Sequence, residues 1–348
     1  IKDVAAEANV SVGTVYRAIN NTGRIKATTR ENVLKAVERL DYKANTVARG
    51  LALRKKFTIL VIMPEQPIAF WGEVINGARK AAAELSEFGV KVLEHFFIQG
   101  ASGHQSIMDL LSDNEVDAIA MSMVNFDSYK LVLDYSAENK IPVALFNEEL
   151  ENSQRFFFYG PNNYLAGQMA AELMYKFCGG FGKCCIISNV KHRFGESSIR
   201  RIQGFYDYIE NNKLEKFRII DTYNSTIEDI PILIQQMMKN SPEIKGFYFS
   251  EYSLLYSSRR LLSQTEKKYV VIGHEYTHEF KELLSDGSIT ALLTQEKVCQ
   301  GYYPLMMLYD YLITGETLIS DTYYSNINII INSNLEYLKY SEYGCGYK

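Results

Sequence analysis

The chain has 348 residues, of which 47% are hydrophobic and 22% charged, with a formal net charge of −4. This length allows two or three domains of ordinary size. No apolar run approaches the ~20 residues that a membrane-spanning helix needs, so we expect a cytoplasmic protein with no membrane partner. The five cysteines include no Cys-x-x-Cys pair, and no histidine has ligand spacing to a cysteine. We therefore expect neither a disulfide framework nor a metal site.

Charge divides the chain near residue 56. Residues 1–56 hold 12 basic and 5 acidic residues, a net charge of +7, whereas residues 57–348 carry a net charge of −11. A basic module on an acidic body predicts that nucleic acid meets only the first part of the chain.

Residues 9–20, NVSVGTVYRAIN, define the first module. Ser11 is a suitable N-cap for a helix. Apolar residues recur at intervals of three and four, which predicts one inward face. That face comprises Val15, Ala18 and Ile19. On the outer face, Arg17 has the side chain best shaped to bond O6 and N7 of a guanine in the major groove; a surface helix that happens to carry one arginine is the alternative.

A helix on either side completes a three-helix module over residues 1–44. Residues 1–8, IKDVAAEA, place apolar side chains at helical spacing, and residues 20–23 contain turn-forming residues that break the chain. Thr28 and Glu31 form the Thr-x-x-Glu pattern that begins a helix. The predicted inner stripe of this third helix comprises Val33, Leu34, Val37 and Leu40.

These stretches resemble the headpiece of the lactose-repressor (LacI) family. The similar segments occur in the family's order and without gaps; they are Asp3-Val4-Ala5, VSVGTVYRAIN, TTRENV at 28–33 and LDYKANTVARGLA at 40–52. The resemblance implies a DNA-binding helix-turn-helix. The residues that it places at DNA are Lys2, Ser11, Val12, Gly13, Thr14, Tyr16, Arg17, Asn20, Arg24 and Thr29.

Within that set, the resemblance implies that Val12, Gly13 and Arg17 read bases, whereas Ser11, Thr14, Asn20 and Thr29 contact phosphates, with Lys2 and Arg24 beside them. Gly13 departs from the family because it has no side chain. Val12 offers only apolar contact, for example to a thymine methyl. We therefore expect the operator to be read mainly through Arg17 and the shape of the DNA.

Residues 45–56 are expected to link the headpiece to the body, with Asn45 as a cap. In the LacI family this segment becomes a hinge helix on DNA, pairs with its twin and wedges a leucine into the minor groove. That leucine is Leu51 here. The resemblance thus implies a homodimer on near-palindromic double-stranded DNA; an ordinary linker with a buried leucine is the alternative.

From Phe57 onward, short apolar runs alternate with amphipathic stretches, which predicts an α/β body of parallel sheets flanked by helices. Two doubly wound sheets are expected, since a single sheet would be unusually long. The predicted strands are 57–63, 90–96, 117–121, 141–146, 183–188, 245–250, 268–273 and 289–294. The predicted helices include 72–88, 128–139, 163–177, 198–211 and 253–264.

This body, residues 57–348, resembles the periplasmic-binding-protein architecture, and most closely its ribose- and galactose-binding type. The resemblance implies two similar subdomains that are joined by three crossings and close on a ligand. The crossings are expected near 147–157, 274–289 and 314–324. The subdomains would then be 57–147 with 290–313, and 157–274 with 324–348.

The same resemblance assigns the ligand residues, which are Phe70, Trp71, Asn147, Arg201, Ser250, Glu275 and Gln295. Aromatic rings cover the apolar face of a sugar, and planar fork-shaped groups bond its vicinal hydroxyls. Asn147, Ser250 and Glu275 stand where aspartate, asparagine and aspartate are usual, so we do not expect ribose itself. Phe70 and Trp71 as core aromatics, and Arg201 in a surface ion pair, are the alternatives.

The sequence as a whole predicts a transcriptional regulator, acting as a repressor of a carbohydrate-utilisation operon, whose affinity for DNA a sugar-like effector controls. It would act in the cytoplasm at the nucleoid. We expect no enzyme, no cofactor and no catalytic residue, because no nucleophile–base pair, phosphate loop or metal cluster is recognisable. A nucleobase corepressor on the same fold and a transport-type solute-binding protein remain alternatives.

Overall fold

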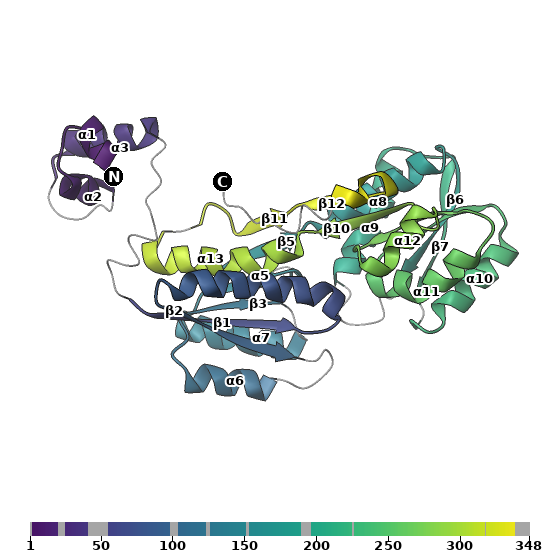
Figure 1. Ribbon diagram of the computed structural model, residues 1–348, viewed down its shortest axis with the longest axis horizontal. Coiled ribbons are helices and arrows are strands. Elements are labelled where there is room, and N and C mark those ends of the chain that lie inside the picture. Colours follow the sequence, from purple (N-terminus) through teal and green to yellow (C-terminus); the bar gives the residue numbers. More distant parts are fainter. Residues whose placement is uncertain are drawn as a thin grey trace. The chain divides into compact units, whose positions relative to one another are not determined.

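The computed structural model describes residues 2–19, 25–40, 55–97, 104–122, 126–150, 153–188, 196–224, 226–316 and 318–337. The chain divides into two compact units, residues 1–55 and 56–348. Figure 1 draws the elements of both units. The division falls beside the boundary at which the charge changes sign in the sequence.

The first unit contains the three expected helices, α1 (Lys2–Glu7), α2 (Val12–Ile19) and α3 (Ala27–Arg39). Ser11 caps α2, because its Oγ accepts a hydrogen bond from the amide of Thr14 at 3.2 Å. The small core that the three helices enclose comprises Val4, Ala5, Val15, Ala18, Val33 and Ala36.

The inner stripe expected for α3 is wrong at two of its four positions. Leu34 and Leu40 are 44% and 42% exposed. Steps of three and four from the buried Val33 lead to Ala36 and Val37, which pack on the core. Leu34, one residue from Val33, is turned about 100° away from it on a helix of 3.6 residues per turn. Leu40 lies beyond Arg39, the last residue of α3, and so does not continue the helical face.

The first sheet of the body has six described strands in the order β11-β5-β4-β3-β1-β2, and all its described pairings are parallel. These strands are β1 (Phe57–Pro64), β2 (Val90–Phe97), β3 (Ala118–Met121), β4 (Val143–Phe146), β5 (Phe157–Pro161) and β11 (Thr322–Ser325). Successive residues of β1 face opposite sides of the sheet. Ile59 and Val61 therefore belong to the hydrophobic cluster on one face, and Leu60 and Ile62 to the cluster on the other.

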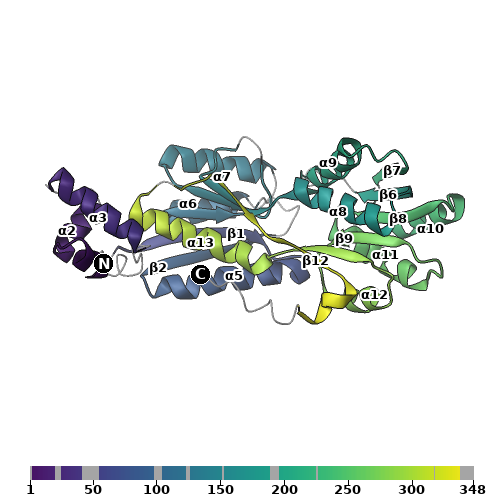
Figure 2. The ribbon, with the colours of Figure 1, turned by 90° about the horizontal axis from the view of Figure 1, so that it is seen from above.

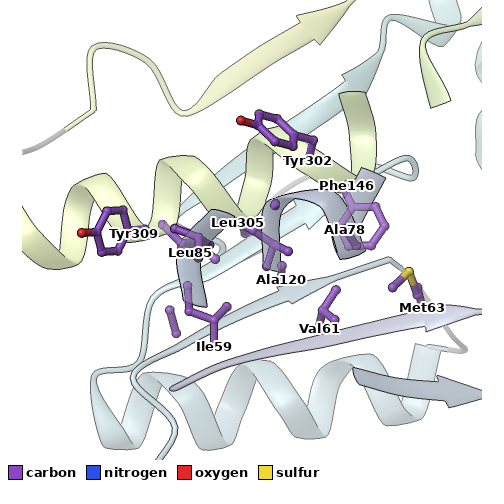
Figure 3. Packing of buried hydrophobic residues seen from close by; sticks show 14 of the residues in the cluster. Ile59, Val61, Met63, Ala78, Leu85, Ala120, Phe146, Tyr302, Leu305 and Tyr309 are labelled. Atoms are coloured by element: carbon purple, nitrogen blue, oxygen red, sulfur yellow. The ribbon is translucent and has the colours of Figure 1, made fainter. Parts of the chain in front are cut away.

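Helices α5 (Ile68–Ser86) and α13 (Lys297–Thr314) cover one face of this sheet, and α6 (His104–Asp113) and α7 (Phe126–Asn139) cover the other. Figure 2 shows α5 and α13 running together along the sheet. Their cluster of buried side chains is drawn in Figure 3, where Ile59, Val61 and Met63 of β1 lie beneath Leu85 and Leu305. A strand that is buried on both faces is apolar along its length, so β1 could be predicted from the sequence.

The second sheet has the order β12-β10-β9-β8-β6-β7 and is parallel except for β12, which runs antiparallel to β10. Its described strands are β6 (Gly182–Ser188), β7 (Phe217–Asn224), β8 (Ile244–Phe249), β9 (Val270–His274), β10 (Ala291–Gln295) and β12 (Ile327–Ile330). One face is covered by α8 (Asn163–Phe177) and α9 (Glu196–Asn211). The other is covered by α10 (Ile230–Asn240), α11 (Tyr252–Gln264) and α12 (Lys281–Ser285). Two short 3₁₀ helices, His278–Phe280 and Asn332–Tyr337, complete the described elements.

All eight predicted strands are present, within a few residues, and the two-sheet α/β fold is confirmed. The four further strands are β5, β7, β11 and β12, and each lies at or next to an edge of its sheet. Among the described helices, none is both long and apolar enough to cross a membrane.

The chain changes sheets at places that differ from the expected crossings. Strand β5 stays in the first sheet, so the first change follows Pro161 and not residues 147–157. Strand β10 stays in the second sheet, so the next change follows Gln295 and not residues 274–289. The third lies at Asn326, between β11 and β12, just beyond the expected 314–324.

These changes of sheet define two subdomains of the body. The first subdomain comprises the elements within 57–161 and 297–325, and the second comprises those within 163–295 and 327–337. The expected assignment of residues 290–313 to the first subdomain therefore holds for α13 but not for β10. The physical reason is that β5 and β10 pair with the preceding strands β4 and β9, and so extend their own sheets before the chain crosses.

Candidate functional site

The two subdomains repeat one local turn at the end of a strand. Asn147 follows β4 with φ of 67°, and Glu275 follows β9 with φ of 65°. The amide of Asn147 donates to the carbonyl of Tyr159 at 3.2 Å, and the amide of Glu275 donates to that of Leu293 at 2.9 Å. A left-handed conformation is unfavourable for a residue other than glycine and persists where the surrounding structure imposes it, often at functional sites. Both turns lie at carboxyl ends of parallel strands, where open α/β sheets bind ligands.

A chain of side-chain hydrogen bonds connects these two turns. The side-chain Nδ2 of Asn147 donates to Gln300 Oε1 at 3.0 Å. Gln300 donates in turn to Gln295 Oε1 at 2.9 Å, and Gln295 donates to Glu275 Oε1 at 2.7 Å. The structure thus brings together Asn147, Gln295 and Glu275, three of the residues that the sequence singled out.

Gln300 joins this chain and was not predicted from the sequence. It is fully buried and lies on the first turns of α13, five residues after Gln295. In the sequence, the signal that points to Gln300 is its place on the segment directly after Gln295. Its partner Asn147 is 153 residues away along the chain.

The Glu275 carboxylate lies among polar and cationic groups. Its Oε2 accepts a hydrogen bond from Thr294 Oγ1 at 3.3 Å and lies 3.9 Å from Lys297 Nζ. Burial raises the pKa of Glu275, and the charges of Lys297 and Arg201 oppose that rise.

Arg201 is held inside the second subdomain. Its side chain is 6% exposed; Nε donates to Asn163 Oδ1 at 2.9 Å, and Nη1 donates to the carbonyl of Ser250, also at 2.9 Å. The alternative of a surface ion pair is therefore wrong. Ser250, which follows β8, is buried and shares a hydrogen bond of 2.5 Å with Ser198 on α9.

Two glycines allow helix α9 to carry Arg201 this close to α8. A Cβ added to Gly167 would lie 1.8 Å from the carbonyl oxygen of Arg201, and one added to Gly204 would lie 2.0 Å from that of Tyr164. The helix backbones therefore touch, and this contact places Arg201 beside Asn163.

Glu148 is a second residue that the sequence reasoning missed. Burial raises its pKa to about 7, against the hydrogen bond from Ser197 and the charge of Arg201. Ser197 Oγ donates to Glu148 Oε1 at 3.0 Å, whereas the buried Oε2 has no hydrogen-bond partner among the described residues. A buried carboxyl group that titrates near neutral pH is typical of functional sites. Its position directly after Asn147 was the available signal.

A cavity of about 280 Å³ adjoins Arg201 and Glu148. It is lined by Asn163 and Ser197, which are the hydrogen-bond partners of Arg201 and Glu148. It lies where the chain passes between the subdomains. Its lining comprises Glu149, Pro161, Asn162, Asn163, Tyr164, Glu196, Ser197, Arg200 and Tyr324.

Phe70 and Trp71 differ in their surroundings. Trp71 is 8% exposed and belongs to the core cluster of the first subdomain with Met63 and Val74. Phe70 is only partly buried, meets the Trp71 ring edge-on at 5.2 Å, and has Lys297 Nζ at 5.8 Å from its ring centre. Of the two aromatic residues, Phe70 is the one beside the polar groups of the site.

In the headpiece, the structure describes the side chains of Ser11, Thr14 and Thr29. Ser11 is exposed, and Thr14 and Thr29 are partly so. A Cβ on Gly13 would approach only Ser11 Oγ, at 3.9 Å, so packing does not require a glycine there. Only the helical backbone is described for Lys2, Val12, Tyr16 and Arg17, and four predicted residues lie outside the described ones, namely Asn20, Arg24, Asn45 and Leu51.

Known relatives match the two units separately. The family of the periplasmic binding protein domain matches residues 59–317, and the bacterial regulatory proteins of the lacI family match residues 1–45. Catabolite control protein A of Priestia megaterium is 45% identical over 82 residues, which cover 24% of this chain and 25% of that protein. HTH-type transcriptional regulator RegA of Clostridium acetobutylicum is 41% identical over 78 residues, or 22% of this chain and 23% of that protein. The chain thus matches about a quarter of the length of these curated relatives.

Solved structures resemble the body. A glucose-galactose binding protein from Geobacillus stearothermophilus has a TM-score of 0.70 at 21% identity and covers 81% of this chain and 99% of its own. An arabinose binding protein from the same organism has a TM-score of 0.69 at 21% identity, with the same coverage. At this identity the likeness establishes the fold alone. The chain belongs to the family built on the periplasmic binding protein domain, and its residues 1–45 match the lacI family of bacterial regulatory proteins.

Proposed function

We propose that this protein is a sequence-specific DNA-binding transcriptional regulator whose affinity for its operator is controlled by a small sugar-like effector. The headpiece binds the DNA, and the effector binds between the two subdomains of the body. The protein acts in the cytoplasm as a homodimer on a near-palindromic site, because two copies of a headpiece impose two-fold symmetry on the DNA that they read.

The observation that carries this proposal is the union of the two units in one chain. A lacI-family headpiece precedes a body with the fold of sugar-binding proteins. The line of polar side chains from Asn147 through Gln300 and Gln295 to Glu275 supplies amide and carboxylate groups at the meeting of the subdomains. Groups of this kind suit the paired hydroxyls of a sugar ring.

The effector class is tested by thermal unfolding of the full chain with D-glucose, D-galactose, arabinose, adenine and guanine. A ligand at 100 times its dissociation constant adds about 2.7 kcal/mol to the free energy of unfolding. We expect a sugar to raise the melting temperature of the wild-type protein and not that of Arg201→Ala. Stabilisation by a purine alone would favour a nucleobase corepressor and contradict the sugar assignment.

The DNA function is tested with operator sequences selected from a random pool by the purified protein. Arg17→Ala is expected to cost about 1–3 kcal/mol and to relax the preference at one base pair in each half-site. Arg17→Lys is the matched control, since it keeps the charge but loses the fork that bonds two acceptors of guanine. A protein that binds a sugar and selects no DNA sequence would be a solute-binding protein instead.

A further inference from the structure

Lys297 is the first residue of α13, and its side chain is only 4% exposed. It lies where the two subdomains meet. Its Nζ donates to Glu73 Oε1 on α5 at 2.8 Å and to the carbonyl of Tyr276 at 3.4 Å. The same atom lies 3.9 Å from Glu275 Oε2 and 5.8 Å from the ring centre of Phe70. One ammonium therefore contacts the first subdomain through Glu73 and Phe70, and the second through Glu275 and Tyr276.

Lys297 and Glu73 belong to helices that are packed as one body. A Cβ on Gly77 of α5 would lie 1.9 Å from the carbonyl oxygen of Val298, and a Cβ on Gly301 of α13 would lie 1.9 Å from that of Val74. Helices in such close contact do not slide past each other without steric overlap. The contacts of Lys297 with Glu275 and Tyr276 are thus the ones that a movement between the subdomains must change.

A buried ammonium needs partners, and it also acts on them. Taking a charge out of water is unfavourable unless it is paired and hydrogen-bonded. The charged groups that face Glu275 are Lys297 from α13 and Arg201 from α9. Glu73 of α5 accepts a hydrogen bond from the Lys297 ammonium. Burial and the charge of Arg201 hold the pKa of His274 on β9 well below its usual value.

We propose that Lys297 is a positioning residue of the effector site, whose ammonium fixes the Glu275 carboxylate and fastens the turn after β9 to helix α5. This role rests on the proposed effector site between the subdomains. Lys297 acts through Glu275, and the hydrogen bond from Gln295 on the other carboxylate oxygen completes the orientation of that group. The Glu275 carboxyl group then presents an acceptor of fixed direction to a sugar hydroxyl.

The role of Lys297 is tested first without any ligand. Carboxyl carbons of glutamate are labelled with ¹³C in the full chain, and Glu275 is assigned by its loss in Glu275→Gln. In Lys297→Met the burial of Glu275 is no longer opposed by the ammonium, so the pKa of Glu275 is expected to rise relative to wild type. Lys297→Arg is the matched control and is expected to keep the wild-type titration.

Sugar binding supplies the second readout. Titrations with D-glucose, D-galactose and arabinose are expected to show weaker binding to Lys297→Met below the new pKa of Glu275 and partial recovery above it. Unchanged titration of Glu275 in folded Lys297→Met overturns the proposal, and so does a shifted titration with sugar affinity that is independent of pH. If Lys297→Met does not fold, Lys297→Gln serves in its place. If none of the sugars binds, the proposed effector class fails, while the titration of Glu275 still decides the role of Lys297.

Discussion

Among single residues, the neighbours Phe70 and Trp71 lie in different surroundings. Trp71 is packed into the core of the first subdomain, and Phe70 lies beside the Lys297 ammonium. The chain has no other tryptophan, so its emission reports on this position alone. A sugar that covers the Phe70 ring would change the surroundings of the Trp71 indole, which meets that ring edge-on.

The first prediction separates the contribution of Trp71 to stability from the contribution of Phe70 to sugar binding. Trp71→Ala is expected to lower the free energy of unfolding by about 3–5 kcal/mol, as truncation of a large core side chain does, yet to bind the sugar when folded. Phe70→Ala is expected to weaken sugar binding, with a smaller loss of stability. Urea unfolding and sugar titration measure the two effects. A folded Trp71→Ala protein that no longer binds would return Trp71 to the site, where the sequence placed it.

The second prediction concerns the titration of Glu148. Its pKa in the folded protein is about 7, above the ordinary 4.5, so the folded state holds the proton more tightly than the unfolded state. The stability that this proton contributes is present below the ordinary pKa and is lost as pH rises through about 7. The slope for one proton is at most about 1.4 kcal/mol per pH unit.

Urea unfolding between the two pKa values measures this loss. Glu148→Gln is expected to remove that part of the pH dependence, since the amide keeps an acceptor for Ser197 and does not titrate. Glu87→Gln, at an exposed position after α5, serves as the control. An unchanged pH profile in Glu148→Gln would show that another group is responsible.

At the scale of elements, each subdomain packs one pair of helices through glycines. Helices α5 and α13 touch at Gly77 and Gly301, and α8 and α9 touch at Gly167 and Gly204. These contacts place Lys297 beside Glu73 in one subdomain and Arg201 beside Asn163 in the other. The glycines therefore act on the site through the distance between two helix axes.

The third prediction compares two glycines of the same helix. Gly77→Ala is expected to destabilise the protein by about 1–3 kcal/mol, because the added Cβ would overlap the backbone of α13. Gly72→Ala is the matched control: its Cβ would meet only the side chain of Ile68, at 3.4 Å, and alanine favours a helix by up to about 1 kcal/mol. Thermal unfolding of both variants decides the matter, and equal effects would mean that α5 and α13 are not in backbone contact.

At the level of the complete body, the passages of chain that join the two subdomains are short in the described structure. Strand β10 ends two residues before α13 begins in the first subdomain, and β11 ends two residues before β12 begins in the second. Short joints favour rotation of one subdomain against the other as a hinge. A ligand that bonds both sides shifts such an equilibrium only by its difference in affinity for the two arrangements.

The fourth prediction is that effector and DNA binding are coupled. A saturating sugar is expected to change operator affinity by 1–3 kcal/mol, or roughly 5- to 150-fold, which is the usual range of such coupling. Fluorescence anisotropy of labelled operator, with and without the sugar that stabilises the protein, measures the change. Operator affinity that stays the same at saturation would rule out control by that sugar.

Elements whose signals are local could be predicted from the order of the amino acids. Ser11 caps α2 because a hydroxyl next to a helix start bonds its free amides, and β1 is a strand buried on both faces, which leaves an uninterrupted apolar run. The two sheets, the helix-turn-helix and the membership of Asn147, Gln295 and Glu275 in one neighbourhood followed from such patterns and from the resemblance to known families.

Which side chains meet across the fold depends on long-range packing that local patterns do not encode. Gln300 and Lys297 reach the site because α13 returns from the second sheet to pack on α5, and their partners Asn147 and Glu73 are 153 and 224 residues away in sequence. The crossings lie away from their expected places because β5 and β10 are short strands, and a short strand is assigned to a sheet by its hydrogen-bonded neighbour and not by its own residues. The burial that raises the pKa of Glu148 likewise comes from surroundings that no local pattern encodes.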